Sequence, residues 1–313
     1  MSTAEPGSVI VSVETLSCFD YLVWLRTGEN AARRLGVDQA TVARTARKVA
    51  ATFELKLEKQ GGEWQILGDR NLLDLERSSH QLYRWQMDLP LRIEAQYYSG
   101  PLFLEPLPAG WLAGNFDFLE VSTPQQHLRS GVIDAWIGCF PDIPDADDPD
   151  LACVHLTRLP THLVVAAGHP LLRLKEAVTL DDVHHYPSLA LPDGAFPKVQ
   201  AALQELGLWS TPCDLRRYDQ AHWEGQTADE VTVGYATSVS LGLFPTPRVI
   251  LPVPIPLEVG DTLVVPRRFL AHPRSRQLLA HLKRRARELV DRHPDVRLVG
   301  TSKNHTMAWP DLK

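Results

Sequence analysis

Apolar residues recur at helical spacing in two short segments near the start of the chain. From Leu16 to Leu25 they stand three and four positions apart, and Gly28 then interrupts the pattern. Between Glu29 and Leu35 the apolar positions again share one face, and Gly36 supplies the stop that is common at the end of a helix. The pattern therefore predicts two helices joined by a tight connection.

A third helix and a hairpin follow. Asp38 is a favourable N-cap residue, and the stretch after it predicts a helix with one apolar face, formed by Val42, Ala46, Val49 and Phe53. Apolar and polar residues then alternate on both sides of Gly61-Gly62, which is the signal of a β-hairpin. Three helices and a hairpin predict a winged helix-turn-helix unit over residues 1–69.

Leucines recur three and seven positions apart within residues 70–89, at Leu72, Leu75, Leu82 and Leu89. A helix that is otherwise polar and carries such a stripe is expected to pair with its copy in a second chain. We therefore predict a linker and dimerisation helix over residues 70–89, and a homodimer or homotetramer.

From residue 90 onward, short apolar runs alternate with helical stretches. Such alternation predicts an α/β region with a mostly parallel sheet and helices on both faces. We expect two lobes, the first at about 90–162 and 266–290 and the second at about 163–265, followed by a loose tail at 291–313.

Composition narrows the class of protein. The chain has 313 residues, of which 44% are hydrophobic, so it can fill the cores of more than one domain. It shows no run of about 18 apolar residues and no export signal, so we expect a cytoplasmic protein without a membrane partner. The four cysteines lack a CxxC pair and the histidines lack ligand spacing, so we expect no metal and no cofactor.

The net charge of −6 hides a basic segment near the third helix. Between Arg26 and Lys48, six basic residues face only Glu29 and Asp38. In a major groove, Gln39 and Arg44 suit base edges, and the other basic residues suit phosphates. The alternative is a solvated helix that its basic residues keep soluble. The candidate DNA-binding residues are Arg33, Arg34, Gln39, Thr41, Arg44, Thr45, Arg47, Lys48 and Lys59.

Five segments, in order along the chain, resemble the LysR-type transcriptional regulators. The run "AARRLGVDQATVAR" is similar to the helix-turn-helix signature of that family, with Ala31, Ala32, Leu35 and Gln39 at the family's spacing. The runs "LRSGVIDAWIG", "GHPLL", "VTLDDVHHYPSLAL" and "FLAHPRSRQLLAHL" are similar to segments of its effector domain. The resemblance implies a bilobal effector domain with the type 2 periplasmic-binding-protein fold. It also implies double-stranded DNA, a small-molecule effector and RNA polymerase as partners.

The chain departs from the family pattern in the DNA-binding region. Ala40 stands where family members commonly carry a proline or a serine, and Ala43 stands where they commonly carry a serine. A hydroxyl that could hold a phosphate is therefore lost. The wing also lacks the family's usual threonine-glutamate-alanine-glycine ending. These departures imply weaker or differently specified DNA contacts.

Several polar residues follow predicted strands, at the edge where open α/β sheets bind ligands. The hydroxyls of Ser99, Ser122 and Thr123 could orient an anion together with free backbone N–H groups, or could simply cap helices. Cys139 stands where, by the resemblance, some members that bind aromatic acids have an arginine. That substitution, together with the negative charge of Asp193, favours a small neutral or zwitterionic effector over a dianionic or purely aromatic acid. The candidate effector-binding residues are Ser99, Gly100, Ser122, Thr123, Cys139, Asp193 and Gln226.

Two other classes of protein share the bilobal architecture. A periplasmic solute-binding protein would need an export signal, and an enzyme would need a catalytic motif such as GxSxG, a P-loop or HExxH; none is present in the sequence. We therefore predict a DNA-binding transcriptional regulator whose C-terminal domain senses a small molecule, and not an enzyme.

Overall fold

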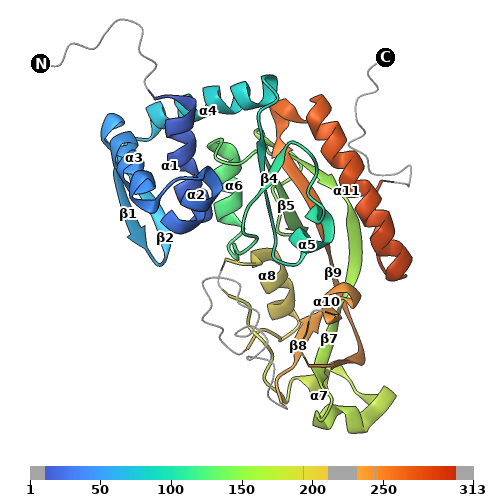
Figure 1. The fold of residues 1–313 in the computed structure, drawn as a ribbon. Coiled ribbons are helices and arrows are strands. Elements are labelled where there is room, and N and C mark those ends of the chain that lie inside the picture. Colours follow the sequence, from blue (N-terminus) through green and yellow to red (C-terminus); the bar gives the residue numbers. More distant parts are fainter. Residues whose placement is uncertain (1–10, 193, 211–230, 243, 245, 301–313) are drawn as a thin grey trace, which may run out of the picture.

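The structure is a computed structural model, and it describes residues 11–192, 194–210, 231–242, 244 and 246–300. Figure 1 shows a helical unit at the N-terminal end, a connecting helix and an elongated α/β region. The helices α1 (Val13–Leu25), α2 (Gly28–Leu35) and α3 (Gln39–Thr52) precede the antiparallel strands β1 (Lys56–Gln60) and β2 (Glu63–Leu67).

Side-chain caps and one core define this first unit. The first helix begins after Ser12, the second after Thr27 and the third after Asp38, and each of these side chains accepts a backbone N–H of the first turn. The apolar faces meet in a single buried cluster. The predicted winged helix-turn-helix is confirmed, and we call α1 to β2 the winged-helix unit.

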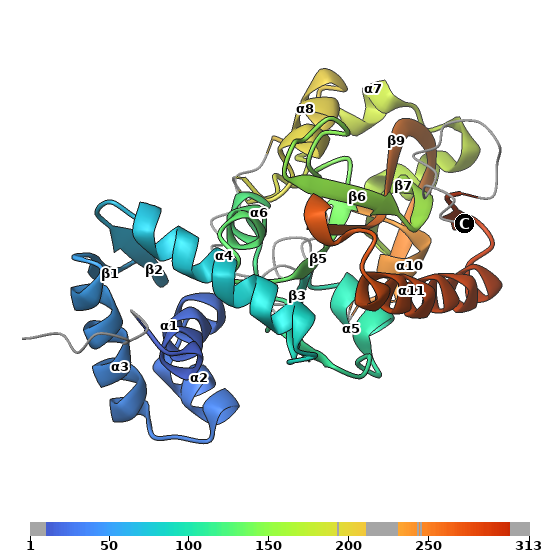
Figure 2. The same ribbon diagram turned by 90° about the horizontal axis from the view of Figure 1, so that it is seen from above.

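The connecting helix α4 (Asn71–Gln86) has two different faces. Figure 2 shows it running between the winged-helix unit and the α/β region. One face is buried within the chain, including Arg77, Gln81 and Trp85. The other exposes Leu72, Leu75 and Leu82, with exposed fractions of 49%, 67% and 43%.

The α/β region has two lobes joined by two long strands. Lobe I contains β3 (Leu91–Ala95), α5 (Ser99–Leu104), β4 (Trp111–Ala113), α6 (Ser122–Arg129), β5 (Ala135–Phe140), β6 (Leu151–His155), η2 (Arg267–Phe269) and α11 (Pro273–Arg292). Lobe II contains η1 (Pro170–Ala177), α7 (Leu180–Val183), α8 (Pro197–Glu205), β8 (Gly234–Ala236) and α10 (Ser238–Leu241). The strands β7 (Thr157–Ala166) and β9 (Arg248–Pro266) run through both lobes.

The pairing of these strands corrects one expectation. Among the described residues, β3 is parallel to β4 and β5, whereas every pair that involves β7 or β9 is antiparallel. The sheet is therefore mixed and not mostly parallel, because β7 and β9 cross between the lobes side by side instead of joining them through helical crossovers. Separate apolar clusters fill lobe I and lobe II.

The first part of the expected loose tail has regular structure, which the weak sequence pattern does not suggest. The helix α11 continues to Arg292, and β10 (Arg297–Leu298) pairs with β7. Part of the expected loose tail is therefore bound to the sheet. Among the described residues, no helix has the length and apolar character needed to cross a membrane.

Candidate DNA-binding surface and effector pocket

The third helix of the winged-helix unit presents a polar face to the outside. Its N-cap is well formed, because Asp38 accepts the backbone N–H of Thr41 at 2.8 Å and its hydroxyl at 2.6 Å. These two hydrogen bonds also lower the pKa of Asp38. Gln39, Arg44, Arg47 and Lys48 are exposed, whereas Val42, Ala46, Val49 and Ala50 are buried beneath them.

Three of the candidate residues of α3 have partners inside the unit. The hydroxyl of Thr41 accepts a hydrogen bond from Arg44 at 2.8 Å while it donates to Asp38. Thr45, expected to face outward, is half-buried and hydrogen-bonds the thiol of Cys18 in α1. Thr45 therefore faces the core side of α3, whereas Gln39, Arg47 and Lys48 are exposed.

The predicted phosphate contacts in α2 and the wing lie in different surroundings. Arg33 is exposed and pairs with Glu29. Arg34 instead turns toward lobe I, where it donates to the carbonyl of Ala113 at 2.6 Å. Lys59 is exposed on β1, 5.5 Å from the centre of the Trp64 ring. Arg34 thus holds the winged-helix unit to the α/β region in this arrangement.

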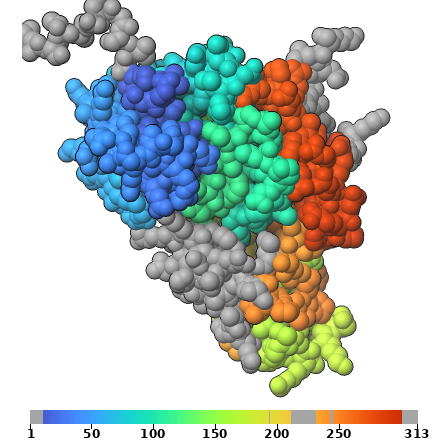
Figure 3. Space-filling view, viewed as in Figure 1, coloured from blue at the N-terminus to red at the C-terminus, as the bar shows by residue number. Residues whose placement is uncertain are grey.

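An apolar interface joins α1 to lobe I. Trp24 and Leu25 are each 1% exposed and belong to the same buried cluster as Phe118, Val132 and Trp136 of lobe I. Figure 3 shows the blue N-terminal unit lying directly against the green and teal surface. The winged-helix unit and lobe I therefore share a continuous core, which ties their positions together.

A buried carboxylate lies at this interface. Glu94, in β3, accepts a hydrogen bond from the indole nitrogen of Trp24 at 2.7 Å, and backbone N–H groups of Phe116 and Ala95 at 3.0 and 3.1 Å. Its burial raises the pKa of Glu94 to about 7, although these three donors act in the opposite direction. The protonation of one side chain is therefore linked to the contact between the two parts of the chain.

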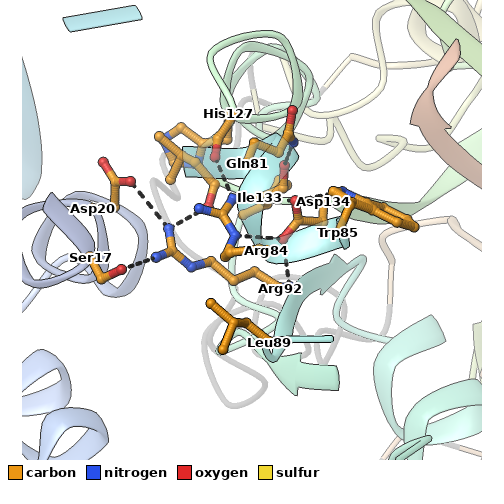
Figure 4. A network of polar contacts seen from close by, with 12 residues as sticks. Ser17, Asp20, Gln81, Arg84, Trp85, Leu89, Arg92, His127, Ile133 and Asp134 are labelled. Atoms are coloured by element: carbon orange, nitrogen blue, oxygen red, sulfur yellow. Dashed lines mark hydrogen bonds and ion pairs between the residues drawn. The ribbon is translucent and has the colours of Figure 1, made fainter. Parts of the chain in front are cut away.

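A buried ionic network reinforces the interface (Figure 4). Asp20 of α1 pairs with Arg77 of α4 at 2.8 Å and with Arg92 of β3 at 3.2 Å. On the other side of Arg92, Asp134 pairs with Arg84 at 3.2 Å and accepts the backbone N–H of Arg92 at 2.9 Å. Removing one partner would leave another charge buried without compensation, so the network holds the winged-helix unit, α4 and lobe I in one arrangement.

A pocket of about 140 Å³ lies between the lobes. Tyr98 and Cys139 line it from lobe I, Phe196 and Leu203 line it from lobe II, and Thr161 lines it from the crossing strand β7. Burial raises the pKa of the Cys139 thiol to about 12, so the thiol is protonated near neutral pH. Such a position suits the binding of a small molecule by contact rather than by covalent chemistry.

The other candidate effector residues lie elsewhere. Ser99 is fully buried and donates to Asp261 at 2.5 Å. Gly100 packs against Phe116, whose ring would lie 2.3 Å from an added Cβ. Ser122 is exposed beside Glu120, and Thr123 lines a separate cavity of about 600 Å³ between the wing and α6. Asp193 and Gln226 lie outside the described residues.

Sequence reasoning missed the polar residues of the interface and most residues of the pocket. Asp20 and Glu94 each interrupt an apolar run, in "LSCFDYLVWL" and "LRIEA", and a charge in a buried segment was the signal that could have drawn attention to them. Asp261 and Thr161 carried no comparable signal, because their place in the pocket depends on how the long strands cross.

A winged helix-turn-helix, a connecting helix and a bilobal α/β region are the parts that the resemblance in sequence leads one to expect. Residues 115–221 match the family model described as LysR substrate binding domain. The resemblance to this family that the sequence predicts is thus confirmed by a family model over part of the α/β region. Over most of the chain it is confirmed in the fold. A search of curated proteins finds no match to the chain.

Solved structures give the same result for the fold. Full-length OxyR from Pseudomonas aeruginosa, in a form with one cysteine replaced by aspartate, matches with a TM-score of 0.55 and 17% identity, covering 87% of this chain and 97% of that one. The regulator CbnR in complex with its target DNA matches with a TM-score of 0.51 and 15% identity, covering 88% and 100%. A structure of CbnR described as a LysR family transcriptional regulator has a TM-score of 0.50 and 15% identity, covering 88% and 99%.

Proposed function

We propose that this protein is a cytoplasmic, DNA-binding transcriptional regulator whose α/β region binds a small molecule and thereby changes how the protein binds a promoter. The observation that carries the proposal is the exposed face of α3, which presents Gln39, Arg44, Arg47 and Lys48 on a helix whose opposite face is buried. A helix of this kind fits the major groove, with base edges and phosphates as its partners. The similarity of the fold to a regulator described in complex with its target DNA supports the same function.

The exposed face of α4 supports a homo-oligomer. Leu72, Leu75, Leu82, Tyr83 and Met87 are all more than two fifths exposed, while the opposite face of the helix packs in its own chain. A second copy would cover this stripe and place two α3 helices on one duplex. Two-fold symmetry of the protein then predicts a palindromic DNA site.

The shared core of α1 and lobe I offers a route from effector to DNA. A ligand that draws the lobes together shifts lobe I, and the winged-helix unit must follow because Trp24 and Leu25 are packed within that lobe. The resulting change in the spacing of the two α3 helices would alter the geometry of the promoter that RNA polymerase meets. In this account no catalytic step is involved.

Selection of bound duplexes from a random DNA library, using the full-length protein with and without a cell metabolite extract, tests the proposed function. We expect a palindromic motif whose enrichment or spacing changes when the extract is present. Failure to enrich any motif in either condition would contradict a sequence-specific regulator.

A matched pair of variants tests the proposed route. Trp24→Phe removes an indole donor to Glu94 of lobe I, whereas Trp64→Phe removes an indole donor to the carbonyl of Arg26 within the winged-helix unit. We expect only Trp24→Phe to reduce the effect of the extract on DNA binding. Equal effects of the two substitutions would rule out this route, but they would not contradict the proposal that the protein binds DNA.

A further inference from the structure

The walls of the pocket between the lobes are predominantly apolar. Leu102 and Leu159 contribute from one side and Phe196, Val199 and Leu203 from the other. The phenol rings of Tyr97 and Tyr98 lie edge to face with centres 5.2 Å apart. Such walls would remove the apolar surface of a bound ligand from water, and their aromatic rings would contact it. They therefore favour a ligand with a compact hydrocarbon body.

The charges around the pocket disfavour an acid. No lysine, arginine or histidine is among the described residues that line it. Its one carboxylate, Asp261, is 3% exposed and already accepts hydrogen bonds from Ser99 at 2.5 Å and from Thr157 at 2.7 Å. A ligand carboxylate would therefore be desolvated beside a buried acid, and Arg158, whose charge acts on Asp261, is not among the lining residues.

Most hydroxyls of the pocket are already engaged. Thr237 and Ser240 hydrogen-bond each other in the cap of α10, and the hydroxyl of Tyr235 accepts the backbone N–H of Trp209 at 3.1 Å. Thr161 differs from these. It is 7% exposed, and its hydroxyl has no hydrogen-bond partner among the described residues. A buried hydroxyl without a partner is costly, and a polar group of a bound molecule would satisfy it.

We propose that the effector is a compact uncharged molecule, a single ring with one hydroxyl or carbonyl group, and that Thr161 Oγ1 is its hydrogen-bond partner. This inference rests on the proposed function for the role of the pocket, and on the lining residues for the class of ligand. The volume of about 140 Å³ sets the size, since an engineered apolar cavity of about 150 Å³ is known to hold benzene. Polar metabolites that carry a net charge are outside this class.

Calorimetric titration of the full-length protein with three ring compounds of similar size tests the class. Phenol is uncharged at pH 7, benzoate is an anion and benzylamine is a cation. We expect phenol to bind most tightly. Benzoate should bind at least about tenfold more weakly than phenol, because the charge of its carboxylate would be buried without a partner. Benzoate or benzylamine binding as tightly as phenol, or phenol failing to bind, would overturn the proposal.

Two substitutions test the role of Thr161. Thr161→Val keeps the shape but removes the hydroxyl, and should weaken phenol binding roughly 2- to 10-fold while leaving toluene binding unchanged. Thr161→Ser restores the hydroxyl and should restore most of the affinity for phenol. Ser122→Ala removes an exposed hydroxyl outside the pocket and serves as the control. Unchanged phenol affinity in a folded Thr161→Val variant would overturn the assignment.

Measuring DNA binding on the same samples distinguishes a failure of the ligand class from a failure of the regulator function. Loss of the predicted ligand order with intact DNA binding would refute only the ligand class. Absence of DNA binding with the predicted ligand order intact would refute the regulator function and leave the ligand class standing.

Discussion

Replacing Glu94 with glutamine should change how the stability of the protein depends on pH. The carboxyl group has an ordinary pKa of 4.5 when exposed, and burial raises it to about 7 in the folded chain. Below pH 4.5 the carboxyl is protonated in both states, so it makes no difference to stability there. Between the two values the folded state retains a proton that the unfolded state has lost, so the free energy of unfolding falls as pH rises.

The size of this effect follows from the two pKa values. At 1.36 kcal/mol for each pH unit, the shift corresponds to about 3 kcal/mol, and the loss is complete above pH 7. A glutamine cannot ionise and escapes this loss. Its amide nitrogen, however, would meet the indole N–H of Trp24, and one lost buried hydrogen bond costs about 1–3 kcal/mol at every pH. The variant should therefore be less stable than the wild type at pH 5 and equally or more stable at pH 8.

Urea unfolding followed by circular dichroism at several pH values between 5 and 8 measures this difference. Other groups contribute to the absolute curves, since burial lowers the pKa of His127 to about 3 and of His155 to about 4, which makes stability rise with pH. These contributions are common to both proteins and cancel in the difference. A difference in stability that does not change with pH would show that the folded state does not raise the pKa of Glu94. Glu176→Gln, at an exposed position, serves as the control.

Further predictions concern the oligomer and the thiols. A double Leu75→Asp, Leu82→Asp variant should be monomeric by analytical ultracentrifugation and should lose DNA affinity while it stays folded. The reason is that both leucines are exposed on the face of α4 that does not pack within the chain. An unchanged sedimentation coefficient would show that this face is not part of the interface. Cys139 and Cys153, whose pKa burial raises to about 12, should resist iodoacetamide in the native protein and react after unfolding; rapid native labelling, located by mass spectrometry, would contradict this assignment.

The elements of the winged-helix unit could be predicted because their signals are local. Asp38 caps a helix that begins at the next residue, and the apolar positions of α3 recur with the period of a helix, so neighbours in sequence determine the structure. The leucine stripe of α4 was visible for the same reason. These features depend on a few adjacent residues and little on the rest of the chain.

The interface and the pocket depend on contacts between distant positions. Ser99 looked like a ligand-binding hydroxyl at the end of a strand, but it bonds Asp261, which is 162 positions away. Arg34 looked like a phosphate contact, but it bonds Ala113 of lobe I. One sequence offers no evidence for such pairs, since many partners are chemically equivalent until the fold brings one of them close.

Salt-dependent DNA binding by the full-length protein is the most direct test of DNA binding through α3. Fluorescence anisotropy with a selected duplex, between about 50 and 200 mM salt, should show affinity that falls steeply with salt. Lys48→Ala should reduce the slope by about one, and Arg44→Ala should lower discrimination against one base change by about 1–3 kcal/mol. Arg173→Ala, at an exposed position of lobe II, should change neither quantity. Affinity that does not depend on salt, or equal losses in the Lys48 and Arg173 variants, would contradict DNA binding through α3.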